Sequence, residues 1–177
     1  KQLNKKNSVH VFSNGCKFES NTIDKNWAKA FKNTKNNWVF VGSWHQPNIE
    51  GIRRLVDSGL CNLDSRKVKL WILGSVGEPI KNFIQHFNKN DTVVQIVGES
   101  SDADISNSIS ASTGIIIPIW SGGGSNLKTA QALLSEKQII ATTFAFRGFE
   151  NYISESGVKI FDDSSDFVEE LANQSFN

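Results

Sequence analysis

The chain has 177 residues, of which 38% are apolar and 21% charged, and these proportions are typical of one soluble globular domain. Its 19 Lys and Arg residues and 18 Asp and Glu residues leave a net charge of +1, which excludes a broad basic surface for nucleic acid. No apolar run approaches the length of a membrane span, and the two cysteines lack metal-ligand spacing. These features predict a protein of the reducing cytosol.

The first 37 residues do not follow the pattern of the rest of the chain. Residues 9–12 predict a short strand, and the polar residues 33–37 predict a loop. We therefore predict that residues 1–37 are the tail of a preceding domain, a linker or an edge element, and that residues 38–177 form the main domain. The sequence contains no Met, so we expect the chain to be a piece of a longer protein.

From residue 38 onward, apolar runs alternate with segments of helical periodicity. The runs are mostly continuous rather than alternating, which is typical of strands covered on both faces. They are residues 38–41, 68–73, 93–97, 115–117, 138–141 and 158–161. The helical segments are residues 48–58, 79–87, 102–111, 125–135, 147–154 and 164–172. Asp102 and Ser164 are predicted N-caps.

This alternation predicts an α/β fold with a doubly wound, Rossmann-like parallel sheet of about six strands and helices on both faces. In the common strand order 3-2-1-4-5-6, the loops after the first and fourth strands face each other, and ligands bind between them. These loops hold residues 42–47 and 120–125. The topology therefore predicts a ligand site with Gly42, Ser43 and His45 on one wall.

The opposite wall holds the most informative motif of the chain. Gly122, Gly123 and Gly124 follow a buried strand, and Ser125 and Asn126 open the next helix. The backbone N–H groups of such a loop and helix start bind anions. Because the motif is neither a P-loop nor the dinucleotide-binding glycine pattern, kinase, ATPase and NAD-binding functions are disfavoured.

Lys128 lies in the first turn of that helix, where the helix macrodipole disfavours a cation, so we expect it to serve a ligand. Gln131 is close to it on the helix surface, and the two are expected to reach one ligand. The buried face is predicted to hold Leu127, Ala130, Leu133 and Leu134. The alternative is that the glycines form only a flexible turn and that Lys128 points into water.

Other residues near the predicted cleft have plainer explanations as well. His45 is equally consistent with an ordinary loop residue. Trp44 and Trp120 flank the cleft, where they either stack on a base or sugar or pack beneath the loops. The sequence shows no Ser/His/Asp, Cys/His or metal-ligand constellation, so we expect any chemistry to rest on the ligand's own phosphates or on residues outside this sequence.

Taken together, these motifs resemble the carboxyl-terminal, donor-binding half of GT-B glycosyltransferases, especially the retaining family 4, or group 1, enzymes. The resemblance covers residues 38–173. Residues 40–43 are similar to the first strand and loop of that family, and residues 94–98 to its third strand, where the nucleobase lies. The most specific part is residues 118–142, which are similar to the donor-binding core.

The resemblance implies which residues bind a nucleoside diphosphate sugar. The amides of the glycine loop would hold the diphosphate, and Lys128 would act as the catalytic residue that stabilises it as it leaves. Gln131 would meet the ribose, and Val97 and Gly98 would border the base. The implied donor-binding set is Gly42, Ser43, His45, Val97, Gly98, Gly122, Gly123, Gly124, Ser125, Asn126, Lys128 and Gln131.

Two features depart from the family pattern. Where the family has two glutamates, one of them bound to the ribose hydroxyls, this chain has Gly123 and Gln131. A neutral amide binds a hydroxyl less strongly than a carboxylate does. In the loop after the first strand, Ser43, Trp44 and His45 stand where the family has a basic residue.

The implied function is transfer of a sugar, with retention of configuration and without a metal or other cofactor, from a nucleoside diphosphate sugar to a glycan or lipid-linked acceptor in polysaccharide biosynthesis. An amino-terminal half that binds the acceptor would be missing, so the chain alone is expected to be inactive. The predicted location is the cytoplasm, with peripheral contact to the inner face of the membrane through that half; no transmembrane segment and no nucleic acid partner are expected. The two departures also leave open a non-catalytic, glycosyltransferase-like nucleotide-binding or assembly module. A NAD-dependent or epimerase-like enzyme is disfavoured, because the glycines follow the fourth strand rather than the first.

Overall fold

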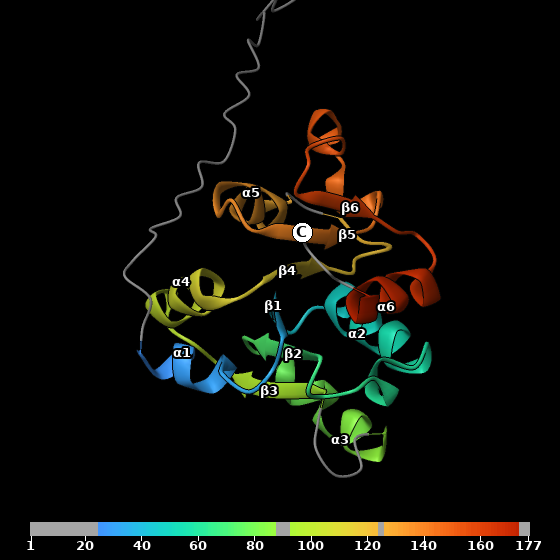
Figure 1. Ribbon diagram of the computed structural model, residues 1–177. Helices are drawn as coiled ribbons and strands as arrows, with labels where there is room; N and C mark the ends of the chain where they lie inside the picture. The colour runs from blue at the N-terminus through green and yellow to red at the C-terminus, as the bar shows by residue number, and fades with distance from the viewer. Residues whose placement is uncertain (1–24, 88–92, 124–125, 174–177) are drawn as a thin grey trace, which may run out of the picture.

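The computed structural model describes residues 25–87, 93–123 and 126–173. Its centre is a six-stranded parallel sheet with the order β3-β2-β1-β4-β5-β6 (Figure 1). The strands are β1 (Asn36–Val41), β2 (Val68–Leu73), β3 (Val94–Gly98), β4 (Gly114–Ile117), β5 (Gln138–Ala141) and β6 (Val158–Ile160). The predicted α/β fold and strand order are confirmed.

Helices cover both faces of this sheet, with α2, α3 and α6 on one face and α1, α4 and α5 on the other (Figure 1). The α-helices are α1 (Lys25–Phe31), α2 (Gln46–Asp57), α3 (Gly77–Phe87), α4 (Asp102–Ala111), α5 (Leu127–Leu134) and α6 (Ser164–Asn173). Three short 3-10 helices are η1 (Leu60–Asn62), η2 (Phe144–Phe146) and η3 (Glu150–Tyr152). This double cover explains why the strand sequences are continuously apolar.

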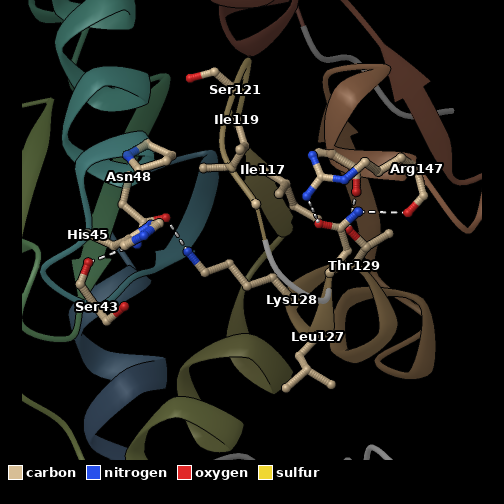
Figure 2. A pocket seen from close by; sticks show the side chains of 14 residues that line it. Ser43, His45, Asn48, Ile117, Ile119, Ser121, Leu127, Lys128, Thr129 and Arg147 are labelled. Atoms are coloured by element: carbon tan, nitrogen blue, oxygen red, sulfur yellow. Dashed lines mark hydrogen bonds between the residues drawn. The ribbon is translucent and has the colours of Figure 1, made fainter. Parts of the chain in front are cut away.

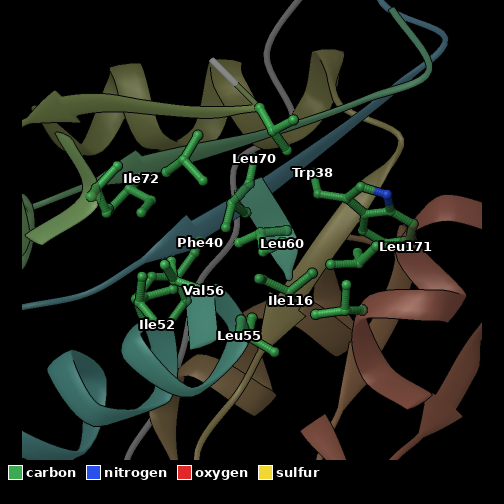
Figure 3. Close-up of a cluster of buried hydrophobic side chains, with 14 of the residues drawn as sticks. Trp38, Phe40, Ile52, Leu55, Val56, Leu60, Leu70, Ile72, Ile116 and Leu171 are labelled. Atoms are coloured by element: carbon green, nitrogen blue, oxygen red, sulfur yellow. The ribbon is translucent and has the colours of Figure 1, made fainter. Parts of the chain in front are cut away.

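Successive strand residues point into two hydrophobic cores, one on each face of the sheet. Trp38 and Phe40 of β1 are fully buried in the core beneath α2, where they pack with Ile52 and Leu55 (Figure 3). Val39, between them, is buried in the core on the opposite face. Burial of a side chain of this kind contributes about 1.5–3 kcal/mol, so both cores fix β1 and the loop that follows it.

Two helix caps differ from the sequence prediction by one residue. Ser101 rather than Asp102 caps α4, because its hydroxyl accepts the N–H of Asp104 at 3.1 Å. Asp163 rather than Ser164 caps α6, because its carboxylate accepts two N–H groups of the first turn, at 2.8 and 3.1 Å. In both helices the capping side chain comes from the residue just before the first helical one.

The predicted helix over residues 147–154 is wrong, since the segment contains only the short helix η3. Arg147 has an extended backbone, with φ −60° and ψ 129°. Gly148 has a φ of +83°, in the left-handed region that glycine adopts readily. The Glu150 carboxylate holds this turn by accepting the Gly148 N–H at 2.8 Å. Arg147 therefore lies in the loop after β5, near the carboxyl edge of the sheet.

The predicted buried face of α5 is only partly correct, since Leu133 packs against the core but the two outer leucines do not. Leu127 and Leu134 are 40% and 51% exposed, whereas Thr129 and Ala132 are buried. The Thr129 hydroxyl donates to the carbonyl oxygen of Ala145 at 2.6 Å, so its burial leaves no unpaired polar group. The same hydrogen bond ties the first turn of α5 to the loop after β5.

The first strand begins at Asn36, before its predicted start at residue 38. Asn36 and Asn37, which fall in the predicted loop 33–37, belong to β1. The helix α1 was not predicted, and it packs its aromatic residues against the sheet. The strand expected at residues 9–12 lies outside the described residues, and the domain division at residue 37 stays a prediction.

Asn37 joins α1 to the sheet through one buried side chain. Its Nδ2 donates to the carbonyl oxygens of Phe31 and Thr34, each at 3.1 Å. Its Oδ1 accepts a hydrogen bond from Nε1 of Trp71 in β2, at 3.0 Å. The amide therefore satisfies three groups from three segments of the chain.

Asn37→Ala is predicted to lower the free energy of unfolding by about 3 kcal/mol, because it leaves buried carbonyl and indole groups without partners. Urea denaturation followed by circular dichroism measures this change. Asn151→Ala, at an exposed position of η3, is the matched control and should change stability by less than about 0.5 kcal/mol. Equal stability of the two variants would contradict the role assigned to Asn37.

Candidate functional site

The candidate site lies at the carboxyl ends of β1 and β4, where the winding of the sheet reverses (Figure 2). A cavity of about 210 Å³ separates the loop after β1 from the loop after β4. The described residues that line it are Ser43, His45, Pro47, Asn48, Ile117, Ile119, Ser121, Gly123, Asn126, Leu127, Lys128, Thr129, Ala145 and Arg147. The predicted position of the site between these two loops therefore coincides with a cavity.

The two charged side chains among the described lining residues of this cavity are both cations. Lys128 reaches it from α5, and Arg147 reaches it from the loop after β5. His45 lies at the N-cap position of α2 on the opposite wall. None of the lining residues that the structure describes is Asp or Glu. Such a lining favours an anionic ligand.

Lys128 extends across the cavity from α5 towards α2 (Figure 2). Its Nζ donates a hydrogen bond to Oδ1 of Asn48 and lies 5.0 Å from the centre of the Phe40 ring. Burial lowers the pKa of Lys128 from 10.5 to about 8, because desolvation disfavours the ammonium form. A desolvated ammonium attracts an incoming anion more strongly than one in bulk water does.

Asn48 is the residue that holds this ammonium. Its side chain is 4% exposed, and its Nδ2 donates to the carbonyl oxygen of Ser43 at 2.8 Å. The amide orientation that makes this bond turns Oδ1 towards Lys128. Pro47 favours the helix start at this point, since a proline in the first turn sacrifices no hydrogen bond.

Binding of inorganic pyrophosphate is predicted to weaken as the pH rises through about 8. The Lys128 ammonium is protonated below its pKa and neutral above it, so its attraction for the anion is present below about pH 8 and lost above. The association constant should fall by up to about tenfold per pH unit beyond this point. Isothermal titration calorimetry from about pH 7 to about pH 9.5 measures the decline.

Lys128→Arg is the reference variant for this experiment, because a guanidinium stays charged throughout the range. His45, Arg147 and the ionisation of pyrophosphate itself are common to both proteins. Lys128 therefore accounts only for the part of the fall in the association constant that the unsubstituted chain shows and Lys128→Arg does not. The same pH dependence in both proteins would contradict the assignment.

The glycine loop passes directly over the start of α2. Gly122 has a φ of +115°, and a Cβ atom there would lie 2.6 Å from Cγ of Pro47. Gly123 lines the cavity and has open space beside it. Position 122 thus requires glycine because the loop lies so close to Pro47. Gly123, by contrast, leaves room for a ligand. Gly124 and Ser125, which were predicted to bind the donor, lie outside the described residues.

Two predicted donor-binding residues have their polar groups occupied within the protein. Gly42 donates its N–H to Leu73 at 2.9 Å, and its carbonyl oxygen accepts the Val76 N–H at 3.1 Å. Asn126 donates its Nδ2 to the carbonyl oxygen of Arg147 at 2.7 Å. The backbone groups of Gly42 and the side-chain amide of Asn126 are therefore engaged within the protein, where they shape the site.

Val97 and Gly98 line a second cavity, of about 390 Å³, near the end of β3. A shallow third cavity of about 350 Å³ shares Ser43 with the first one. It shares Gly74, Ser75 and Glu99 with the second. A continuous depression therefore runs from α5, along the carboxyl edge of the sheet, to β3.

The two tryptophans expected beside the cleft have different roles. Trp44 is 64% exposed and lines the second cavity, so its ring is accessible to a ligand. Trp120 donates its Nε1–H to the carbonyl oxygen of Asp162 at 2.6 Å and packs against Phe167 of α6. Trp120 is therefore a packing residue beneath the loops.

Gln131 does not line the first cavity, where the ammonium of Lys128 lies. It is exposed on α5 and lines a separate cavity of about 20 Å³, which it shares with Lys128. The Lys128 ammonium instead lies against Asn48 on α2. The prediction that Lys128 and Gln131 reach one ligand stays a prediction.

A sequence model of the family described as glycosyl transferases group 1 matches residues 35–174. The chain belongs to this family. The resemblance predicted from the glycine loop and the strands around it is confirmed. A search of curated proteins gave no match.

Solved structures of GT-B glycosyltransferases have the same fold. Sucrose-phosphate synthase from Thermosynechococcus elongatus is 17% identical with a TM-score of 0.51, and the match covers 82% of this chain and 44% of that one. TarM from S. aureus, solved as a mutant in complex with fondaparinux, alpha-GlcNAc-glycerol and UDP, is 16% identical with a TM-score of 0.52. That match covers 94% of this chain and 31% of TarM. The chain thus spans less than half the length of either protein.

Within residues 25–87, 93–123 and 126–173, no helix combines the length and apolar character needed to cross a bilayer. Over the same ranges, no cluster of His, Cys, Asp and Glu side chains is arranged to hold a metal ion.

Proposed function

We propose that the chain is the donor-binding domain of a glycosyltransferase that moves a sugar from a nucleoside diphosphate sugar to a glycan or lipid-linked acceptor. The observation that carries this proposal is the cationic cavity between β1 and β4, beside the glycine loop. Membership of the group 1 family supports sugar transfer. The UDP in the TarM structure supports a nucleotide as the ligand class.

The three cavities along the depression could hold the three parts of a nucleoside diphosphate. The diphosphate would lie in the first cavity, against Lys128 and the amide of Gly123. The base would lie in the second cavity, between Trp44 and Val97. The third cavity, which shares residues with both, would hold the ribose. The carboxyl edge of a doubly wound sheet is where such ligands bind.

The main chemical task of this domain would be to stabilise the departing diphosphate. Negative charge develops on the phosphate oxygen as the bond to the sugar breaks. Lys128, fixed by Asn48 before the reaction begins, would offset that charge without reorganisation, and one such preorganised donor typically contributes about 100- to 1,000-fold in rate. We propose that the sugar retains its configuration and that no metal takes part.

The acceptor site is proposed to lie in a part of the protein beyond this sequence, since the chain spans 44% and 31% of the two similar structures. The chain alone would then bind a donor without completing a transfer. We place the reaction in the cytoplasm, in polysaccharide biosynthesis, with the membrane contacted only through the acceptor-binding part.

A calorimetric titration of the chain with UDP, GDP, ADP and dTDP tests the proposal. One of these nucleotides should bind saturably, and the corresponding nucleotide sugar should compete with it. NAD should not compete. Failure of all four nucleoside diphosphates to bind would overturn the proposed function.

A second candidate is a non-catalytic nucleotide-binding or assembly module of the same family. Two features of Gln131 favour this candidate. It stands at the position where the family has a ribose-binding glutamate, and it is exposed outside the first cavity. This candidate predicts nucleotide binding without donor hydrolysis in the protein that carries both halves. Gln131→Glu should then alter affinity without creating turnover.

A further inference from the structure

We propose that Arg147 is the second cationic ligand of the donor diphosphate and that it makes the site select a diphosphate over a monophosphate. This inference rests on the proposed function and assigns a role to a residue that the sequence did not single out. Arg147 lines the same cavity as Lys128 but comes from the loop after β5 (Figure 2).

The guanidinium of Arg147 is held in place from two sides. Its Cζ lies 4.0 Å from the centre of the Phe144 ring, a stacking contact that orients the guanidinium plane. Its Nη2 donates to Oδ1 of Asn126 at 3.3 Å. A guanidinium fixed in this way loses little conformational freedom when an anion binds.

The backbone that carries Arg147 is also fastened to the start of α5. Asn126 donates its Nδ2 to the Arg147 carbonyl oxygen at 2.7 Å. One turn later, the Thr129 hydroxyl donates to the carbonyl oxygen of Ala145 at 2.6 Å. These two hydrogen bonds flank Lys128 in sequence. The positions of both cations are therefore set by the same turn of α5.

The two cations approach the cavity from different directions. Lys128 extends towards α2, where Asn48 holds its ammonium, whereas Arg147 lies on the side of Thr129 (Figure 2) and is hydrogen-bonded to Asn126. A single phosphate would use one of these groups. A diphosphate has a second set of oxygens, and a planar guanidinium pairs well with phosphate oxygens. This arrangement would also supply, from the loop after β5, the positive charge that Ser43, Trp44 and His45 do not provide after β1.

Arg147→Met tests the proposal, with UDP and UMP as the probes in calorimetric titrations. Removal of the guanidinium should weaken UDP binding by about 10- to 100-fold, the range typical of hydrogen bonds between charged groups. UMP binding should change by less than about threefold. The preference for UDP over UMP should therefore shrink. If the chain prefers a base other than uracil, the nucleoside diphosphate and monophosphate of that base replace UDP and UMP as the probes.

Arg53→Met is the matched control, because Arg53 also stacks on a phenylalanine ring, 5.1 Å from the centre of Phe83, but does not line the cavity. Its nucleotide affinities should match those of the unsubstituted chain. Arg147→Lys retains the charge and stem and should give an intermediate loss for UDP alone, which provides the test if the Met variant does not fold.

Three outcomes would count against the proposal. Equal weakening of diphosphate and monophosphate binding by Arg147→Met, or no weakening of either, would overturn this inference while the proposed function stands. Failure of the unsubstituted chain to bind any nucleotide would overturn the proposed function and this inference together.

Discussion

Lys128→Met is expected to weaken nucleoside diphosphate binding by about 10- to 100-fold, since it removes a charge-assisted contact from a desolvated site. Met retains most of the apolar stem that packs near Phe40. The expected loss therefore comes from the charge rather than from the shape of the side chain. Isothermal titration calorimetry with the tightest-binding nucleotide measures it.

Stability separates this effect from unfolding. Replacing Lys128 by an apolar residue removes the cost of burying a cation but leaves Oδ1 of Asn48 without its donor, and these two effects on stability oppose each other. Lys128→Met should therefore retain the free energy of unfolding of the unsubstituted chain within about 1 kcal/mol. Lys32→Met, at an exposed position, is the matched control for charge. Unchanged affinity in Lys128→Met, or equal losses in both variants, would contradict the role of Lys128.

Gly51→Ala is expected to lower the free energy of unfolding by about 3 kcal/mol or more, the range of severe overpacking. Gly51 is buried in α2, and a Cβ atom there would lie 1.9 Å from the carbonyl oxygen of Pro118. Because this oxygen belongs to the backbone, the helix would have to move away from the loop after β4. Such a movement would also displace Asn48 from Lys128 and reduce nucleotide affinity.

The expected loss of stability in Gly51→Ala is informative because helix propensity alone predicts a gain. Ala in place of Gly within a helix stabilises by about 1 kcal/mol when nothing else changes. Gly157→Ala is the control, since its Cβ would have no neighbour closer than 3.9 Å. Urea denaturation should show a large loss for Gly51→Ala and a change below about 0.5 kcal/mol for the control. A more stable Gly51→Ala variant would contradict the close packing of α2 against Pro118.

The fold was predictable because its strands are buried on both faces. Continuous apolar runs such as residues 68–73 and 138–141 coincide with β2 and β5. The position of the site followed from topology alone, because the loops that face each other are fixed by the strand order. Lys128 was identifiable because a cation in the first turn opposes the helix macrodipole.

The details that could not be predicted depend on partners distant in sequence. Thr129 is buried because its hydroxyl meets the carbonyl oxygen of Ala145, and no local pattern reveals such a pair. Asn48 precedes Lys128 by 80 residues, and its role appears only where α2 and α5 meet.

Arg147 was missed for a different reason. Residues 147–154 have a mixed polar and apolar pattern that resembles a helix, yet Gly148 adopts a left-handed conformation and keeps Arg147 in a loop. The available signal was the position of Arg147 just after the fifth strand, at the edge where ligands bind. A basic residue at that edge indicates an anion site as strongly as Lys128 does.

The central claim is that the cavity between β1 and β4 holds the diphosphate of a nucleotide donor. A crystal structure of the chain with the nucleoside diphosphate that binds tightest tests this claim most directly. The phosphate groups are predicted to lie between Lys128 and Arg147, with the base beside Val97 at the far end of the depression. A nucleotide bound away from this edge of the sheet, or with its base in the first cavity and its phosphates in solvent, would contradict the account.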